Sequence, residues 1–434
     1  MKLRTVIIIL IVLLIAAVGF YWYFFMRIPD QIDVFPTPTQ NPGGFDPFDR
    51  TQPTQTSVPT GSNVFPTDTP DGSGTSTPAA LPKLRLLSNT PVGGYGASTT
   101  PANTKLALPA YTTVRWVDRG RGNIYETRMD SLDIKTLSNT VFPKIYESWW
   151  NRNLTTFIAQ YLESNLSEIS TVSANIMSRP SAGTTTMEDV NQTEYELRGN
   201  TLNLSPVNIA VSPKGDRVFY MTIENGVGVG YVSSFTGLNP TKIFETALTQ
   251  VTSDWPEENT IVITTKGSSA QSGYAYFVNP TTKVWRKIIG PLPGLSVKVS
   301  KDAKYALISA SGSNKNILTS IYDVSQGSGT DAIIRTLADK CTWGNFYKEL
   351  IYCAVPSQNI PGTYPDDWYK GTLSTVDKIW QINARTGEIH LVSSIVDKSD
   401  RVIDAFNLNT DQNDNYLYFM NKNDLSLWSL DLVE

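Results

Sequence analysis

The chain has 434 residues, of which 40% are hydrophobic, 11% aromatic and 18% charged, with a formal net charge of −4. So low and balanced a charge provides no basic surface for binding nucleic acid. One histidine and two cysteines are too few ligands for a cytochrome, a zinc enzyme of the two-His type or a thiolate cluster. We therefore predict no metal, no cofactor and no nucleic-acid partner.

The first 26 residues predict a membrane-spanning segment after a short cytoplasmic tail. Lys2 and Arg4 precede an uncharged, mostly apolar run, whose hydrophobic part lies between Val6 and Met26. At about 1.5 Å per residue, a helix of this length spans the roughly 30 Å hydrocarbon layer of a bilayer. Because positive charge stays inside, the N-terminus is cytoplasmic and the rest is exported. The sequence thus predicts a single-pass cell membrane protein with an extracytoplasmic domain.

A cleaved signal peptide is the competing interpretation of this segment. Ala17-Val18-Gly19 provides small residues in places that resemble a cleavage site. The apolar run, however, continues from Phe20 to Met26, which a cleavage region would not do. An uncleaved anchor is therefore the favoured interpretation.

Residues 27–82 are rich in proline, threonine, serine and glycine. Such a stretch cannot bury enough apolar surface to offset the entropy lost on ordering, and we predict a semi-extended, disordered linker. Within it, Val34-Phe35-Pro36-Thr37 recurs as Val64-Phe65-Pro66-Thr67. The recurrence is either chance in a biased segment or a pair of short motifs that dock on a partner or on the folded domain.

Residues 83–434 predict β-structure with an internal repeat. Leu87-Ser88-Asn89-Thr90 returns as Leu137-Ser138-Asn139-Thr140, and further units start near residues 206, 251, 295, 339 and 401. The clearest unit has four strands, over residues 207–212, 217–223, 227–233 and 242–248. A four-stranded antiparallel sheet repeated about every 50 residues is typical of a β-propeller blade.

The two ends of this domain predict how the ring closes. The last unit has strands over residues 403–408, 416–420 and 426–430, after which the chain ends without a fourth strand. Residues 83–87 form a strand of the fourth type with no first three before it. Joining them completes a blade and gives the N-terminal strand a partner. We predict an all-β, seven-bladed β-propeller closed by its N-terminal strand.

One hairpin motif connects the repeat to a known family. Ser212-Pro213-Lys214-Gly215-Asp216 resembles the Ser-Pro-Asp-Gly hairpin of TolB-like, WD40-like propeller repeats, with weaker copies beginning at Val299 and Asn409. The Gly-His and Trp-Asp signatures of WD repeats do not occur. The resemblance implies a propeller that binds proteins or acts as a sensor or scaffold, although some propellers are enzymes, so the fold does not settle the function.

Cys341 and Cys353 flank a predicted hairpin of the sixth blade. A turn centred on Tyr347 places them opposite each other, where Cβ atoms lie about 4.5 to 5.5 Å apart. An exported domain meets an oxidising compartment. We favour a disulfide, with two buried free thiols as the alternative.

The second and third strands of the sixth blade are separated by an insertion, residues 358–370. Aromatic residues held in a proline-restrained loop bury a large area at little entropic cost. We therefore predict a recognition loop formed by Tyr364, Asp366, Asp367, Trp368 and Tyr369. The alternative is a lid that packs on its own blade. Two further insertions, residues 99–111 and 179–198, belong to the opposite face.

Two other motifs suggest chemistry only weakly. Asp411-Gln412-Asn413-Asp414-Asn415 has oxygen ligands at alternate places, as a calcium loop has, but Tyr416 stands where that loop needs glycine. We predict a solvated turn. His390 lies in a predicted outermost strand, far from the axis, and is predicted to be structural.

The tether and the catalytically poor propeller favour a protein-binding or scaffold role at the cell envelope, and no enzyme activity. The first alternative is a propeller that binds glycan or cell wall, with Tyr364, Trp368 and Tyr369 stacking on sugar rings. A less favoured alternative is an enzyme that uses the central channel, for which the innermost strands offer only Glu147, Asp254 and Asp404.

Overall fold

The computed structural model describes residues 81–138, 142, 144–163, 168–179, 194–202, 204–313, 316–359 and 361–433. The predicted cytoplasmic tail, membrane span and linker lie outside the described residues. Among the residues that are described, no helix is both long enough and apolar enough to cross a membrane.

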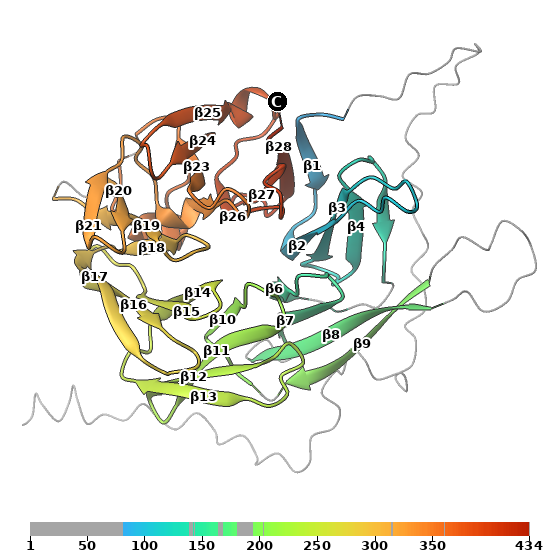
Figure 1. The fold of residues 1–434 in the computed structure, drawn as a ribbon, viewed down its shortest axis with the longest axis horizontal. Coiled ribbons are helices and arrows are strands. Elements are labelled where there is room, and N and C mark those ends of the chain that lie inside the picture. The colour runs from blue at the N-terminus through green and yellow to red at the C-terminus, as the bar shows by residue number, and fades with distance from the viewer. Residues whose placement is uncertain are drawn as a thin grey trace, which may run out of the picture. The chain divides into compact units, whose positions relative to one another are not determined.

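Seven four-stranded antiparallel sheets surround a common axis (Figure 1). Blade 1 comprises, from the axis outward, β2 (Val92–Thr100), β3 (Tyr111–Asp118), β4 (Ile124–Arg128) and β5 (Ile134–Thr136). Blade 2 comprises β6 (Ile145–Trp150), β7 (Thr156–Leu162), β8 (Ile169–Arg179) and β9 (Glu194–Leu202). Blade 3 comprises β10 (Asn208–Val211), β11 (Arg217–Glu224), β12 (Val227–Ser234) and β13 (Thr241–Thr246).

The remaining blades follow the same order. Blade 4 comprises β14 (Val251–Glu257), β15 (Thr260–Thr265), β16 (Ser272–Val278) and β17 (Trp285–Pro293). Blade 5 comprises β18 (Ser296–Val299), β19 (Tyr305–Ser311), β20 (Ile317–Asp323) and β21 (Ser328–Asp331). Blade 6 comprises β22 (Cys341–Trp343), β23 (Leu350–Pro356), β24 (Asp377–Asn383) and β25 (Ile389–Ser393). In the described part of the chain, the short helices η2 (Ala338–Lys340), α2 (Asp366–Lys370) and η3 (Ile395–Asp397) lie in connections.

Blade 7 is built from both ends of the domain. Its inner strands are β26 (Ala405–Thr410), β27 (Tyr416–Asn421) and β28 (Leu427–Asp431), and its outer strand is β1 (Leu84–Ser88). The register pairs Leu84 with Leu430 and Leu86 with Trp428. The prediction of an all-β, seven-bladed propeller closed by the N-terminal strand is confirmed.

The core lies between neighbouring blades. Phe219 and Met221 of β11, for example, share one apolar cluster with Trp255 and Ile261 of the next blade. A middle strand such as β11 is therefore covered on both faces, and it is an almost continuous apolar run without alternation.

The hairpin at Ser212–Asp216, which resembles the TolB-like repeat, shows why a serine follows the first strand of the blade. Ser212 Oγ accepts the N–H of Arg217 at 3.0 Å and donates to Asp216 Oδ1 at 2.8 Å. Ser300 repeats this contact by accepting the N–H of Tyr305 at 3.0 Å. Gly215 has φ +69°, and a Cβ there would lie 2.4 Å from the backbone nitrogen of Arg152, so this turn requires glycine.

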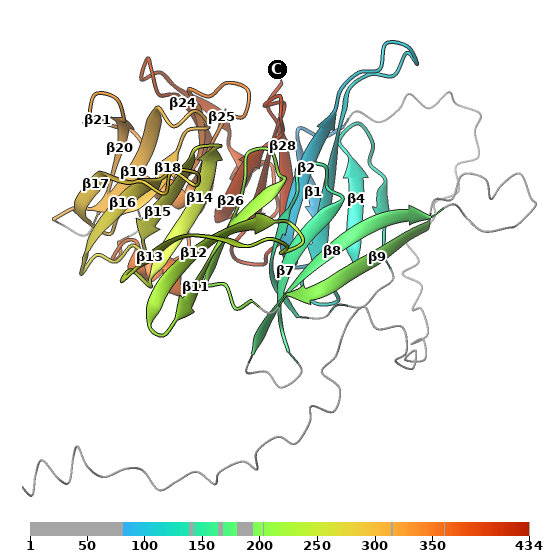
Figure 2. The same ribbon diagram turned by 60° about the horizontal axis from the view of Figure 1, so that its bottom comes forward.

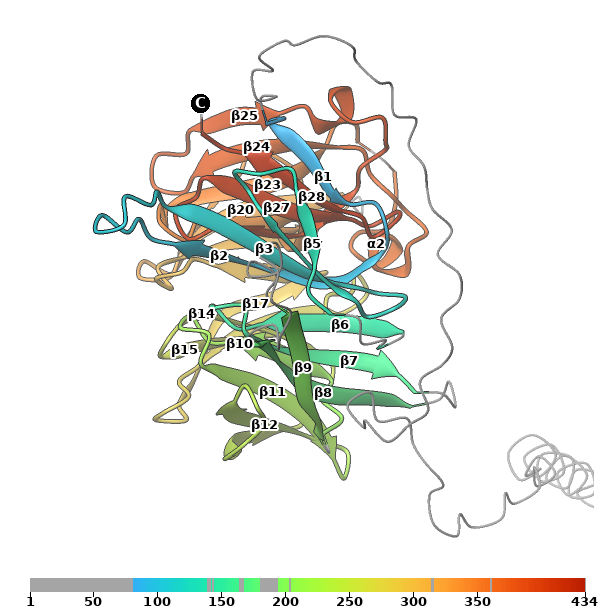
Figure 3. The ribbon, with the colours of Figure 1, turned by 90° about the vertical axis from the view of Figure 1, so that its right-hand side faces the viewer.

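The disc has two faces, which we name by their connections. The a–b face carries the turns between the first and second strands of each blade, and the b–c face carries those between the second and third. Figure 3 shows the connection between β2 and β3 on one side of the disc and α2 on the opposite side. Asp431 N–H donates to Lys83 O at 2.7 Å, and Leu432 N–H donates to Asn415 O at 2.8 Å. The chain therefore enters β1 and leaves β28 at the a–b face.

Two hairpins extend beyond their blades (Figure 2). One is formed by β2 and β3. The other is formed by β8 and β9, which pair from Thr171 and Leu202 to Arg179 and Glu194. Both correspond to insertions predicted for the a–b face.

Candidate recognition surface

The predicted recognition loop belongs to residues 357–376, which we call the strap and which contain α2. Tyr364 and Trp368 are only 5% exposed and form an apolar cluster with Ile317, Leu337 and Leu373. Ser311 Oγ, from blade 5, donates to Tyr364 O at 2.5 Å. The strap is therefore packed on the b–c face of its own and a neighbouring blade.

Polar contacts also join the strap to blade 4. Asp366 accepts hydrogen bonds from Ser268 Oγ at 2.9 Å and from the Ser269 N–H at 2.8 Å. Burial opposes ionisation of Asp366, but these hydrogen bonds outweigh it and hold its pKa below the usual value. Asp367 stays within the strap and accepts the Thr363 N–H at 2.7 Å. Tyr369 donates its hydroxyl to Asp339 Oδ2 at 2.5 Å.

A buried ionic cluster lies beneath Trp368. Its indole N–H donates to both carboxylate oxygens of Asp404 at 3.1 Å. Lys340 Nζ pairs with Asp404 and, at 2.8 Å, with Asp377, and all three are 0–1% exposed. Burial raises the pKa of Asp377 despite Lys340. Burial opposes ionisation of Asp404 too, but Lys340 outweighs it and leaves that pKa low. This cluster connects the strap to the inner end of blade 7.

These contacts limit what the strap presents to a partner. The rings of Tyr364 and Trp368 are used in the interior, so as placed they are not available to stack on a sugar or a protein. Among the described residues of the strap, Tyr369, at 38% exposed, is the most exposed large apolar residue. A recognition role for Asp366, Asp367 and Tyr369 stays a prediction.

Cys341 and Cys353 lie opposite each other in β22 and β23 and are joined by a disulfide. Both are buried. The bond lies just before the turn that connects the two strands, residues 344–349, which we call the aromatic turn. The disulfide therefore holds together the base of this turn.

The aromatic turn exposes two large rings on the a–b face. Phe346 is 63% exposed and Tyr347 49% exposed. Their ring centroids lie 4.9 Å apart at an interplanar angle of 84°, an edge-to-face pair. From the sequence, Tyr347 is predicted only as the centre of a hairpin. The available signal was an aromatic pair at a place where the resembling turns have serine, lysine, glycine or aspartate.

Asp414 of blade 7 fixes the backbone of the aromatic turn. Its carboxylate accepts the N–H groups of Asn345 at 2.8 Å, Phe346 at 3.0 Å and Tyr347 at 2.8 Å. Thr410 Oγ1 donates to the same carboxylate at 2.6 Å. Asp414 is itself buried. The exposed rings therefore stand on a backbone that is already ordered.

Asp411, three residues earlier, accepts hydrogen bonds from blade 1 in a similar way. Its Oδ1 accepts the N–H of Tyr416 at 2.9 Å, and its Oδ2 accepts the hydroxyls of Thr99 and Thr112, each at 3.2 Å. Residues 411–415 form a turn, as predicted, and Asn413 is exposed, but the carboxylates of Asp411 and Asp414 are buried and hydrogen-bonded and not solvated. In the described part of the chain, no group of three or more His, Cys, Asp or Glu side chains is arranged to hold a metal ion.

Thr99 and Thr112 mark the base of the second apolar feature of this face. Every residue from 101 to 110, between β2 and β3, is exposed, and we call this segment the hairpin tip. It includes Leu106, 66% exposed, and Leu108, 52% exposed. The a–b face thus presents two apolar projections, one on each side of the 411–415 turn.

The carboxylates considered for an enzyme do not form a joint site. Asp404 belongs to the buried cluster, and Asp254 pairs with Lys298 of the next blade at 3.1 Å. Although the residue Glu147 as a whole is exposed, the protein around its carboxyl group desolvates that group and raises its pKa to about 7, with Arg119 opposing the shift. Among the described residues, none of the three shares an ion pair or hydrogen bond with another. His390 is exposed on the outermost strand of blade 6.

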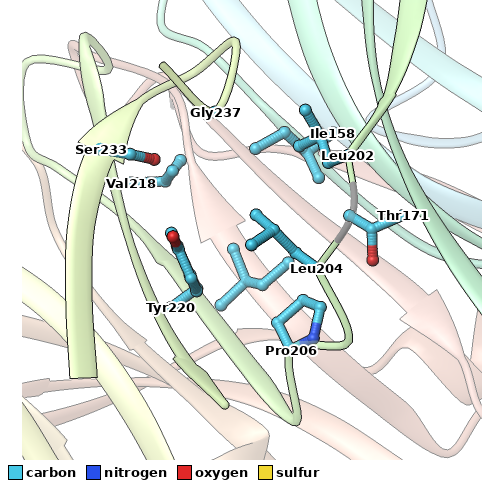
Figure 4. A pocket seen from close by; sticks show the side chains of 10 residues that line it. Ile158, Thr171, Leu202, Leu204, Pro206, Val218, Tyr220, Ser233 and Gly237 are labelled. Atoms are coloured by element: carbon cyan, nitrogen blue, oxygen red, sulfur yellow. The ribbon is translucent and has the colours of Figure 1, made fainter. Parts of the chain in front are cut away.

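Two hollows lie between blades. A small pocket of about 10 Å³ is lined by Ile158, Thr171, Leu204 and Tyr220 among others (Figure 4), which is the space of about one water molecule. An open groove of about 370 Å³ runs beside Arg217, Leu238 and Pro280 at the rim of blades 3 and 4. Neither hollow adjoins the strap or the aromatic turn.

Comparisons with known proteins extend to the fold only. No family model matches the chain, and no curated protein matches its sequence. Among solved structures, the chain is similar to an oligogalacturonate lyase in complex with manganese, at 9% identity and a TM-score of 0.48 over 75% of this chain and 86% of that one. It is also similar to TolB from Acinetobacter baumannii, at 9% identity and a TM-score of 0.35 over 78% and 79%.

A second oligogalacturonate lyase, from Vibrio parahaemolyticus, is 9% identical with a TM-score of 0.46 over 80% of this chain and 99% of that one. The prediction that the protein is not an enzyme is therefore wrong as an inference from its architecture, because two of these similar structures are enzymes by name. Similarity this distant identifies no substrate for the present chain.

Proposed function

We propose that the protein is a protein-binding propeller, tethered to the cell membrane by residues 6–26, that contacts its partner through the aromatic turn on the extracytoplasmic side. The observation that carries the proposal is the exposed Phe346–Tyr347 pair on a backbone fixed by Asp414 and by the disulfide.

Physical chemistry favours a protein partner for such a pair. Aromatic side chains bury 150–250 Å² each on average, and tyrosine is among the residues that dominate binding energy at protein interfaces. Binding usually costs free energy for ordering loops and side chains. Here three backbone N–H groups are already held by one carboxylate, so the ordering cost is low.

The tether fits this role because it raises the concentration of the propeller near partners in the same envelope. Residues 27–82, as a flexible chain, would let the propeller reach about 40 Å from its anchor. A second binding event then becomes intramolecular, with an effective concentration that reaches the millimolar range for short linkers.

Site-specific photo-crosslinking of the full chain in its own membrane tests the proposal. A photoreactive phenylalanine analogue replaces Tyr347 in one variant and Tyr146, an exposed tyrosine outside the aromatic turn, in a matched control. We expect one discrete protein adduct from position 347 that disappears when Phe346→Ala is added. An equal adduct from position 146, or an adduct that survives Phe346→Ala, would exclude the aromatic turn as the contact.

A further inference from the structure

The hairpin tip is the second apolar feature of the a–b face, and we propose that it docks on the surface of the bilayer to which the chain is tethered. This inference rests on the membrane tether of the proposed function, and it concerns a different set of residues from the aromatic turn.

The hairpin tip projects from the disc. β2 and β3 pair over their whole length, whereas β4 covers only Thr113 to Val117 of β3. The last residues of β2, the first of β3 and the ten between them therefore lie beyond the outer strands of the blade (Figure 2). Leu106 and Leu108 are more than half exposed there.

The composition of the hairpin tip suits an anionic lipid surface. It reads Pro-Ala-Asn-Thr-Lys-Leu-Ala-Leu-Pro-Ala from residue 101 to residue 110. It contains no acidic residue, and its one charge, Lys105, adjoins Leu106. Aliphatic side chains next to a cation are what amphipathic surface anchors place at the boundary between headgroups and acyl chains, and a lysine near an anionic leaflet is attracted to it.

The tip is ordered before it meets any surface. Asn103 and Leu108 exchange backbone hydrogen bonds of 2.9 and 3.0 Å. Asn103 Oδ1 also accepts the N–H of Lys105 at 3.1 Å. At the base of the hairpin, Thr99 and Thr112 are held by the buried Asp411. The leucines are thus presented on a stiff projection, and docking requires little further ordering.

The chain enters the propeller at the face that carries the hairpin tip. Residues 81–83 reach β1 at the a–b face, beside the end of β28. Lys83, where the described residues enter β1, therefore lies at the same face of the propeller as the hairpin tip. A linker joined at this face leaves the hairpin tip free to reach the bilayer that holds the anchor.

Two leucines and one lysine bind a membrane only marginally by themselves. The tether changes this, because it converts docking into an intramolecular event. Docking at the hairpin tip would hold the aromatic turn, on the same face, close to partners that share the membrane.

Fluorescence of the full chain reconstituted into vesicles tests the proposal. The two native cysteines are joined in a disulfide, so Leu106→Cys provides one reactive thiol for an environment-sensitive dye. Ile333→Cys is the matched control, since Ile333 is 76% exposed in the connection between β21 and β22, on the b–c face. The vesicles contain phosphatidylcholine, a minority of phosphatidylglycerol and a spin-labelled lipid as quencher.

We expect the dye at position 106 to shift its emission to the blue and to be quenched several-fold more than the dye at position 333. A dye at Thr104→Cys should show the same quenching, and Leu106→Asp with Leu108→Asp should abolish it. Equal quenching at positions 106 and 333, or quenching at position 104 that survives both aspartates, would overturn the proposal.

The outcome also separates this inference from the proposed function. An adduct at position 347 with no quenching at position 106 removes lipid docking alone. Quenching at position 106 with no adduct at position 347 removes the protein-binding role and keeps lipid docking. Release of the full chain from membranes by alkaline washing would overturn the tether and with it this inference.

Discussion

Blade 6 has two connections that are rich in aromatic residues, the strap and the aromatic turn. The strap buries most of its rings, whereas the aromatic turn exposes both of its rings. The strap carries Tyr364, Trp368 and Tyr369 and folds onto the b–c face, where two of its three rings are buried. The aromatic turn carries Phe346 and Tyr347 on the a–b face and exposes both.

Length explains the difference. The strap has enough residues between β23 and β24 to form α2, to reach Ser268 of blade 4 and to pack its own apolar cluster. The aromatic turn is too short to fold back on the disc, and three of its backbone N–H groups donate hydrogen bonds to Asp414. Aromatic content alone therefore does not show whether a loop exposes its rings, because the length of the loop decides whether they can be buried.

The largest expected effect comes from breaking the cluster under the strap. Lys340→Met leaves Asp377 and Asp404 buried without their cation, which should lower the free energy of unfolding by about 3–5 kcal/mol. Chemical denaturation measures it. Lys304→Met, which removes an exposed lysine paired with Asp302, is the control and should change stability by about 0.5 kcal/mol or less.

The same variant has a pH signature. Without Lys340, burial places the folded pKa of the two carboxyl groups above the unfolded one, so the folded state binds more protons than the unfolded state. Stability should then rise as the pH falls through those raised pKa values. A cost that is independent of pH would mean that the cluster is not charged as described.

Reduction of the disulfide should destabilise the aromatic turn at the a–b face of blade 6. Its loop has a sequence separation of 12, for which opening costs about 3 kcal/mol in the chain-entropy description. Thermal unfolding with and without a reductant should show this loss. If Cys341→Ala with Cys353→Ala is as stable as the oxidised chain, the bond does not stabilise the base of the aromatic turn.

Asp414→Ala tests whether the Asp414 carboxylate orders the backbone of the aromatic turn, independently of the exposed rings. The three N–H groups lose a buried acceptor, so stability should fall by about 1–3 kcal/mol, and amide hydrogen exchange at residues 345–347 should accelerate. Phe346→Ala, which removes only an exposed ring, should change stability by about 0.5 kcal/mol or less. Unchanged exchange in Asp414→Ala would contradict a backbone fixed by this carboxylate.

Glu147 provides the smallest expected effect. Its pKa is raised to about 7 in the folded state, above its unfolded value, so ionisation costs stability as the pH rises from about 4.5 through 7. Glu147→Gln should remove this loss, which we expect to be on the order of 1 kcal/mol because solvent screens the exposed side chain. Parallel pH profiles of the two proteins would show that Glu147 is not perturbed.

The sequence predicts the ring well because its signals are local. The Ser212 and Ser300 turns repeat one hydrogen-bond pattern at the end of the first strand, and counting strands at both ends predicts the pairing of β1 with β28. These features depend on residues close together in the chain or on simple strand counts.

The recognition surface is harder to predict because it depends on distant contacts. Trp368 is buried against Asp404, and Phe346 is held outward by Asp414, 68 residues away in sequence. For the same reason the acidic 411–415 turn resembles a calcium loop in its spacing, while its carboxylates in fact bind hydroxyls and N–H groups of blades 1 and 6.

The affinity of the full chain for the protein crosslinked at position 347 measures whether the aromatic turn is the contact surface. Phe346→Ala with Tyr347→Ala should raise Kd about 30-fold or more, as expected for loss of about 2 kcal/mol at a hot spot, while Tyr369→Ala on the strap should leave Kd within about two-fold. A larger loss from Tyr369→Ala than from the double substitution would place the contact on the strap and exclude the aromatic turn.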